Sequence, residues 1–238
     1  MTQTEPATHR TSPSARDAGS LSAQLWRSAE STYALILEHP FLRELGEGTL
    51  DYGCFAHYLV QDDHYIESYT QCLAMLAGRA PDHPAMATLV SHAAEAVALE
   101  STLHAELLEA MQLSHLSRDE MAPTPTTLAY ADSLRASCAI DSFLEGLASV
   151  LPCYWIYAAV GHHLAQVTTP DPVFARWIEN YSGGVYDQAV GEVLDLIDQL
   201  GERAGPAQVE HCIELYRRGA RYEWMFWDAA YRRETWPV

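Results

Sequence analysis

Residues 151–161 read Leu-Pro-Cys-Tyr-Trp-Ile-Tyr-Ala-Ala-Val-Gly and form the middle of an apolar helical stretch that runs from about Asp141 to Gln166. Proline inside a helix removes one backbone donor and crowds the carbonyl four residues earlier, so we expect a bend beside Cys153. Cys153 and Tyr157 are four residues apart and therefore share a helix face. A buried cysteine more often serves as a small hydrophobic residue than as a reactive thiol. Other parts of the sequence must decide which of these two roles Cys153 has.

Composition limits the classes of protein to which this chain of 238 residues can belong. Apolar residues make up 48% of it, which is enough for a real core. The five cysteines have no Cys-x-x-Cys spacing, which argues against a disulfide framework or a thiolate zinc site and fits a reducing compartment. The amino terminus lacks the pattern of a signal peptide, and the longest apolar run is about half of the ~20 residues that span a bilayer. We therefore expect a cytoplasmic protein that does not enter a membrane.

The chain is strongly acidic, with 32 acidic and 14 basic side chains and a formal charge of -18. This charge repels phosphate backbones and anionic lipids, so nucleic acid is not an expected partner. It mildly favours a cationic small molecule, although acidic surfaces most often serve solubility.

Apolar periodicity predicts helices throughout the chain after a Thr, Ser, Pro and Ala-rich start. Residues 1–20 have almost nothing to bury and are predicted to be a disordered extension, which leaves residues 21–238 as one folded domain. No segment shows the sustained alternation of a β-strand. The pattern predicts an all-α bundle of seven or eight helices, at about 21–39, 51–76, 85–113, 128–139, 141–166, 172–181, 184–200 and 206–234.

Asp62 is the first candidate functional carboxylate. It shares a helix face with Tyr65, Ile66 and Tyr69, and such an apolar face is expected to point inward. A carboxylate there must have a partner, and a ring with adjacent amino and imine nitrogens would serve. The alternative is an ordinary salt bridge between helices, or a cap.

Glu223 is the second candidate carboxylate. It lies on the same helix face as Tyr216, Phe226 and Trp227, whereas the arginines of this helix line a different face. Burial against aromatic rings raises the pKa of a glutamate toward neutrality, where it can act as a general acid and base. The alternative is a glutamate at the edge of the core whose carboxylate reaches solvent.

Two aromatic stretches lie at predicted helix ends: residues 125–130, which end in Tyr130, and residues 177–184, which contain Tyr181. Tyrosines at helix ends often merely cover a core with a hydrated hydroxyl. Taken in chain order, however, the motifs resemble the TenA family, the thiaminase II or aminopyrimidine aminohydrolase proteins. The resemblance extends from about residue 21 to residue 231 and rests on Gln61-Asp62-x-x-Tyr65, Thr127-Leu128-Ala129-Tyr130, Leu151-Pro152-Cys153-x-Trp155-x-Tyr157, Trp177-x-x-x-Tyr181 and Tyr222-Glu223-x-x-Phe226-Trp227.

This resemblance implies a heme-oxygenase-like irregular helical bundle, usually a homotetramer, without heme, metal or another cofactor. It implies hydrolysis of 4-amino-5-aminomethyl-2-methylpyrimidine, a thiamin breakdown product, to the 5-hydroxymethyl pyrimidine and ammonia in thiamin salvage. Thiamin itself is the other substrate of the family and is split into pyrimidine and thiazole. The cysteine at the Leu-Pro-x position is typical of the cysteine-type branch.

The resemblance also implies a role for each matching residue. Cys153 would be the nucleophile that adds to the pyrimidine ring, and Glu223 would protonate and later deprotonate a ring nitrogen. Asp62 would hold the 4-amino group and the neighbouring ring nitrogen. The remaining expected contacts are Tyr130, Tyr157 and Tyr181, which position or activate these groups, and Tyr65 and Phe226, which pack on the ring.

The chemistry independently favours this set, because a pyrimidine-methylene bond breaks more easily once a nucleophile has removed the ring's aromaticity and a proton has made it an electron sink. The sequence departs from the family pattern at His64, where an aromatic or small residue is common, and at Thr124-Pro125, where the loop before Tyr130 is slightly long. These departures bear on substrate preference rather than on the central chemistry.

Two other classes of function remain open. A di-iron oxidase needs carboxylates and histidines from several helices. Glu100-x-x-x-His104 has suitable spacing, but the sequence contains no second carboxylate-histidine pair at the spacing of metal ligands. Further candidates for such a site are Glu95, His92, His162, His163 and His211. A non-catalytic pyrimidine-binding or regulatory protein would keep the pocket, but it would not need both Cys153 and Glu223.

Overall fold

The computed structural model describes residues 11–238, apart from the side chains of residues 99–101. This part of the chain is helical and contains no β-strand, which confirms the all-α prediction. Its elements are η1 (Pro13–Ala15), α2 (Leu21–Leu37), α3 (Pro40–Glu47), α4 (Tyr52–Ala77), α5 (His83–Ala110), α6 (Pro125–Ile140), α7 (Phe143–Leu164), α8 (Pro172–Ser182), α9 (Gly184–Gly201) and α10 (Pro206–Tyr231).

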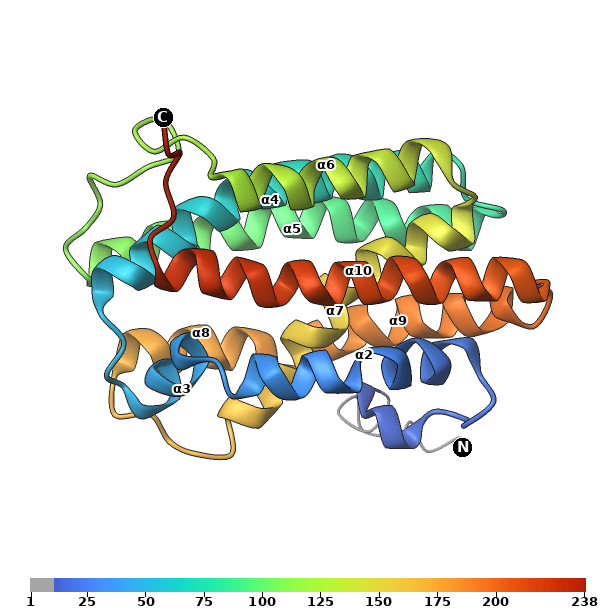
Figure 1. The fold of residues 1–238 in the computed structure, drawn as a ribbon, viewed down its shortest axis with the longest axis horizontal. Helices are drawn as coiled ribbons and strands as arrows, with labels where there is room; N and C mark the ends of the chain where they lie inside the picture. The colour runs from blue at the N-terminus through green and yellow to red at the C-terminus, as the bar shows by residue number, and fades with distance from the viewer. Residues whose placement is uncertain (1–10) are drawn as a thin grey trace.

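Helix α7 crosses the bundle obliquely and packs against helices from both halves (Figure 1). In the view of Figure 1, α4, α5 and α6 lie on one side of α10, whereas α2, α3, α8 and α9 lie on the other. Helix α7 contacts α4 and α6 in the first group and α2, α8 and α9 in the second, as well as α10. A residue in the middle of α7 therefore lies where both groups of helices meet.

The sequence of α7 explains its central position. A capping box starts the helix: the Glu145 amide donates to the Ser142 hydroxyl, and the Ser142 amide donates to the Glu145 carboxylate. By length and composition alone α7 could cross a membrane, but 83% of its apolar window is buried inside the fold. This burial is what a core helix requires, because apolar surface on every side needs packing partners.

Helix α7 continues through Pro152, and the neighbouring helix α10 leaves room for the proline ring. The structure is helical on both sides of the proline. Gly219 of α10 faces the ring, and a Cβ atom there would lie only 2.5 Å from the proline Cγ. The close approach of α7 and α10 therefore depends on a residue without a side chain.

The structure differs from the sequence prediction at Pro40, which ends one helix but also begins another. Proline suits the first position of a helix because its missing N–H has no partner there, and His39 Nδ1 accepts the Phe41 amide at 3.2 Å. Helix α3 then ends at Gly48, whose φ of 74° lies in the left-handed region. The periodicity of so short a segment did not reveal it as a helix.

The structure also differs within the predicted disordered extension, because residues 11–20 contact the bundle. The Thr11 hydroxyl donates to Asp187, and the Thr11 carbonyl accepts the Trp155 indole N–H at 2.7 Å. Arg16 is ion-paired with Asp195 and Asp198 of α9. Polar contacts with α7 and α9, rather than apolar burial, hold this segment; residues 1–10 lie outside the described part.

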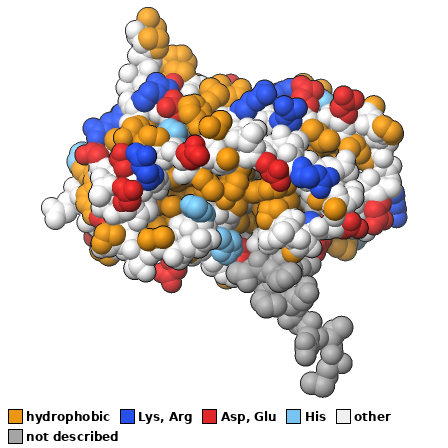
Figure 2. All heavy atoms as spheres, turned by 60° about the horizontal axis from the view of Figure 1, so that its bottom comes forward, with side chains coloured by type: hydrophobic (Ala, Val, Ile, Leu, Met, Phe, Trp, Pro, Cys, Tyr) orange, Lys and Arg blue, Asp and Glu red, His pale blue; other side chains and the backbone are white. Residues whose placement is uncertain are grey.

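Charged side chains of both signs are interspersed with apolar ones on the face shown in Figure 2. Together with the net charge of -18, this mixture gives that face no continuous basic surface that would suit a phosphate backbone.

We predict that Gly161→Ala destabilises the fold. A Cβ atom at this position would lie 2.6 Å from the carbonyl carbon and oxygen of Tyr181, so α7 and α8 would have to separate. We expect the free energy of unfolding to fall by about 1–3 kcal/mol in urea denaturation. Gly184→Ala is the matched control, because a Cβ there has no heavy atom within 4 Å. Equal stability of both variants would contradict the close packing of α7 on α8.

Candidate active site

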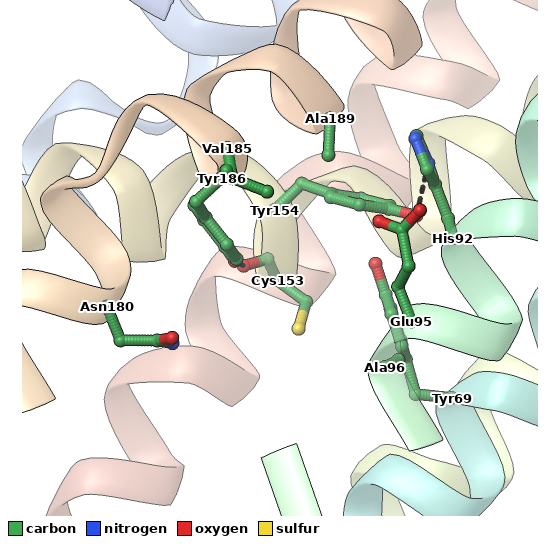
Figure 3. Close-up of a pocket in the computed structure, with 10 residues that line it drawn as sticks. All are labelled: Tyr69, His92, Glu95, Ala96, Cys153, Tyr154, Asn180, Val185, Tyr186 and Ala189. Carbon is green, nitrogen blue, oxygen red and sulfur yellow. Dashed lines mark hydrogen bonds between the residues drawn. The ribbon is translucent and has the colours of Figure 1, made fainter. Parts of the chain in front are cut away.

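Cys153 lines a cavity of about 310 Å³ that is formed mainly by α5, α7 and the α8–α9 corner (Figure 3). In Figure 3 the Cys153 sulfur lies among the labelled side chains, and the amide of Asn180 points toward the same space. The Tyr186 hydroxyl donates to the Cys153 carbonyl at 3.1 Å and ties α9 to α7. The thiol therefore faces an open space, unlike an ordinary packed cysteine.

The other residues predicted for the site are buried and do not line this cavity. Asp62 is 3% exposed and Glu223 is 1% exposed. Electrostatic influence nevertheless links Glu223 to Cys153, because burial and then the charges of Cys153, Tyr130 and Glu223 raise the pKa of Tyr65. The charge of Asp62 in turn raises the pKa of Glu223. Cys153 thus lies at the boundary between the cavity and a buried polar cluster.

Glu223 lies in an apolar environment with one strong hydrogen bond. The Tyr130 hydroxyl donates to Glu223 Oε1 at 2.5 Å, which joins α6 to α10. Burial raises the pKa of Glu223 to about 8; the Tyr130 hydrogen bond opposes this effect, and the negative charge of Asp62 adds to it. The carboxylate does not reach solvent, so the structure excludes the alternative of an edge glutamate.

Asp62 is partnered by residues that the sequence analysis did not assign to it. The Tyr58 hydroxyl donates to Asp62 Oδ2 at 3.2 Å, and His104 Nε2 lies 3.5 Å from the same oxygen. His104 is fully buried, and its Nδ1 is 2.6 Å from Asp63 Oδ1. Burial raises the pKa of Asp62 to about 6, although His104 lowers it. His104 of α5 is therefore the partner on another helix that the salt-bridge alternative expected for Asp62.

Aromatic rings connect the two carboxylates. The Tyr65 ring centroid lies 4.8 Å from that of Tyr130 and 5.8 Å from that of Phe226. The Tyr157 ring lies 5.0 Å from that of Tyr181, and the Tyr157 and Tyr58 hydroxyl oxygens are 3.4 Å apart, within hydrogen-bonding distance. The structure thus brings the predicted aromatic residues into one continuous group.

Gln61 and His64 hold the loop that precedes α6. Gln61 Oε1 accepts hydrogen bonds from the Thr124 amide and the Thr127 hydroxyl, both at 2.8 Å. His64 Nε2 lies 2.7 Å from the Met121 carbonyl oxygen. His64, which departs from the family pattern, therefore contacts this loop, and the two residues together set the position of Tyr130.

The di-iron alternative rested on Glu100 and His104. His104 contacts Asp62 and Asp63, whereas the side chain of Glu100 lies outside the described residues. Within the described residues, no group of three or more His, Cys, Asp or Glu side chains is placed to hold a metal.

Comparison with known proteins identifies relatives over most of the chain. An aminopyrimidine aminohydrolase of Bacillus subtilis is 32% identical over 83% of this chain and 84% of its own length. The thiamine biosynthesis multifunctional protein ThiED of Corynebacterium efficiens is 34% identical over 95% of this chain, which spans 30% of that longer protein.

Solved structures share the fold. A TenA homologue from P. horikoshii superposes with a TM-score of 0.83 and 28% identity, over 90% of this chain and 99% of that one. A heme-oxygenase-like domain from Shewanella denitrificans superposes with a TM-score of 0.69 at 14% identity, over 89% of this chain and 92% of that domain, which confirms the predicted fold class. The model of the TENA/THI-4/PQQC family matches residues 26–233, and the chain therefore belongs to that family.

Proposed function

We propose that this chain is a hydrolase that converts 4-amino-5-aminomethyl-2-methylpyrimidine to the 5-hydroxymethyl pyrimidine and ammonia, and that it also splits thiamin. The observation that carries the proposal is the placement of Cys153 at a cavity with Glu223 and Asp62 in the buried cluster behind it. The name of the Bacillus subtilis relative, an aminopyrimidine aminohydrolase, supports this chemistry, and the name of the Corynebacterium efficiens relative supports a role in thiamin metabolism.

In the proposed reaction, the Cys153 thiolate adds to a ring carbon, and the displaced electron pair moves onto a ring nitrogen, where it forms an N–H bond with the proton of Glu223. The ring is now an enamine, and its π electrons, pushed by the 4-amino nitrogen, expel the leaving group with its bonding electrons. Water adds to the resulting exocyclic methylene and gives its proton to the released ammonia. The ring N–H proton then returns to Glu223, and the ring regains its aromaticity as the thiolate leaves. With a pKa of about 8, Glu223 holds the required proton at neutral pH.

Asp62 binds the pyrimidine edge in this proposal. A neutral carboxyl offers an O–H donor beside a carbonyl acceptor, which matches an imine nitrogen beside an amino group. The raised pKa of about 6 keeps that protonated form accessible near neutrality. Tyr58 and His104 fix the carboxyl group from behind. Tyr157 and Tyr181 border the same cluster, while Tyr65 and Phe226 pack on the ring.

We further place the enzyme in the cytoplasm as a homotetramer. All five cysteines are free and buried, which suits a reducing compartment, and the tetramer follows from the family resemblance. Light scattering coupled to gel filtration tests the assembly, and a monomeric mass would overturn it.

Incubation with the aminomethyl pyrimidine, with ammonia followed over time, tests the activity. We predict that Cys153→Ala lowers the rate by about 10³-fold or more, because no other group replaces the nucleophile, while the substrate still binds. Cys212→Ala is the control, because that buried thiol lies beside Glu145 and Asp141 rather than at the cavity. Normal turnover by Cys153→Ala would remove the assigned nucleophile. Binding without turnover by the unmodified enzyme would favour the regulatory alternative.

We also predict a pH dependence from Glu223. The pKa is raised from 4.5 to about 8 on folding, so between these values the folded protein keeps a proton that the unfolded chain has lost. Stability should therefore decrease as the pH rises from 5 to 8, and the rate should decrease above pH 8 as the acid form is lost. Urea denaturation at pH 5 and pH 8 should show a smaller decrease for Glu223→Gln than for the unmodified protein.

The exposed Glu210 of the same helix provides the control, since Glu210→Gln should keep the full pH dependence of stability and the full rate. Normal activity of Glu223→Gln would mean that a different group transfers the proton.

A further inference from the structure

The cavity extends beyond Cys153 to a wall that the proposed ring chemistry does not use. We define the outer wall as Tyr69, His92, Glu95, Tyr154 and Tyr186, all of which line the cavity (Figure 3). Asp62 and Glu223 belong to the buried cluster behind the thiol. A pyrimidine held by that cluster would direct its methylene substituent from Cys153 toward the outer wall.

The outer wall is anionic. Glu95 is an exposed residue of α5 whose carboxylate points toward the phenol end of Tyr154 in Figure 3. The Ser91 hydroxyl donates to Glu95 Oε1 at 2.8 Å, a contact that leaves its negative charge in place. No lysine or arginine is among the described residues that line the cavity.

His92 does not supply a compensating positive charge. It is 7% exposed, and its Nδ1 and Nε2 atoms lie 3.1 Å from the Tyr154 hydroxyl and 3.2 Å from Glu192 Oε2. Burial lowers the pKa of His92 although Glu192 and Glu95 oppose that effect. Because the imidazole is neutral, the carboxylate of Glu95 acts on the cavity without a compensating positive charge from His92.

The rest of the outer wall is aromatic. The ring centroids of Tyr69 and Tyr154 are 5.6 Å apart at an interplanar angle of 61°, and both side chains are buried. A carboxylate beside tyrosine rings is a combination that attracts organic cations, through charge and through the ring quadrupole.

The proposed substrates carry positive charge where this wall would meet them. The aminomethyl group is an ammonium ion at neutral pH, and thiamin carries a thiazolium ring on the same methylene carbon. The hydroxymethyl product carries no charge there. Resting on the proposed function, we propose that the outer wall is a subsite for the cationic leaving group, with Glu95 as its anion and Tyr69 and Tyr154 as its aromatic surface.

This subsite acts on binding more than on the chemical step. The leaving group takes the bonding electrons when it departs, so its positive charge disappears as the transition state is approached. An anion near it stabilises bound substrate at least as well as the transition state and lowers KM rather than raising kcat. The neutral product gains nothing from Glu95, which favours its release.

Glu95→Gln tests the subsite, since the amide keeps an acceptor for Ser91 but removes the charge. We expect KM for thiamin and for the aminomethyl pyrimidine to rise about three- to tenfold, with kcat changed by less than about twofold. The inhibition constant of the hydroxymethyl product should stay unchanged. Glu109→Gln is the matched control: it removes the same charge from an exposed position of α5 that is ~21 Å further along the helix.

Unchanged KM values in Glu95→Gln, or an equal loss of affinity for the neutral product, would overturn the subsite while ammonia release leaves the proposed function intact. A second measurement does not need turnover. An N-alkylthiazolium cation, titrated against intrinsic fluorescence, should bind more tightly than the neutral thiazole of the same shape, and Glu95→Gln should abolish that difference. No preference for the cation in the unmodified protein would also overturn the subsite.

Discussion

The close packing of α7 against its neighbours is the constraint on which the rest of the structure depends. Gly161 lets α7 contact the backbone of α8 at Tyr181, and Gly219 lets α10 contact the ring of Pro152. These contacts lie on either side of Cys153 along α7. Because the thiol is fixed between two close helix contacts, its distance from the carboxyl of α10 and from the cavity is set by the backbone rather than by flexible side chains.

The sequence predicted the features that depend on local pattern, namely the long helices, though not the short α3, and the inward direction of Asp62 and Glu223. Helical periodicity places a residue on a face, and Pro, Gly, Ser and Asp mark the ends of helices. It did not predict that His104 of α5 would contact Asp62, or that Glu95 would line the cavity, because those neighbours are set by how separate helices pack. Residues 11–20 were missed for a related reason: polar contacts with α9, which composition does not reveal, hold them.

The two buried carboxyls show how one environment can serve two tasks. Burial raises the pKa of both, but His104 and Tyr58 partner Asp62, whereas Tyr130 donates to Glu223. The pKa of Asp62 therefore stays near 6 and that of Glu223 rises to about 8. Groups whose environments separate their pKa values are the usual arrangement for a proton donor beside a binding carboxyl.

The charge arrangement also differs between the buried cluster behind Cys153 and the outer wall of the cavity, and this difference would orient a bound molecule. The buried cluster holds carboxyls that burial pushes toward their neutral forms, so it suits a neutral heterocycle with polar edges. The outer wall has Glu95, exposed on α5, so it suits a cation in contact with water. A molecule that is neutral at one end and positive at the other would be oriented before any bond forms, with its methylene carbon at Cys153 between the two ends. The reaction removes the positive charge, so the product binds more weakly than the substrate. The same arrangement of charges therefore favours both substrate binding and product release.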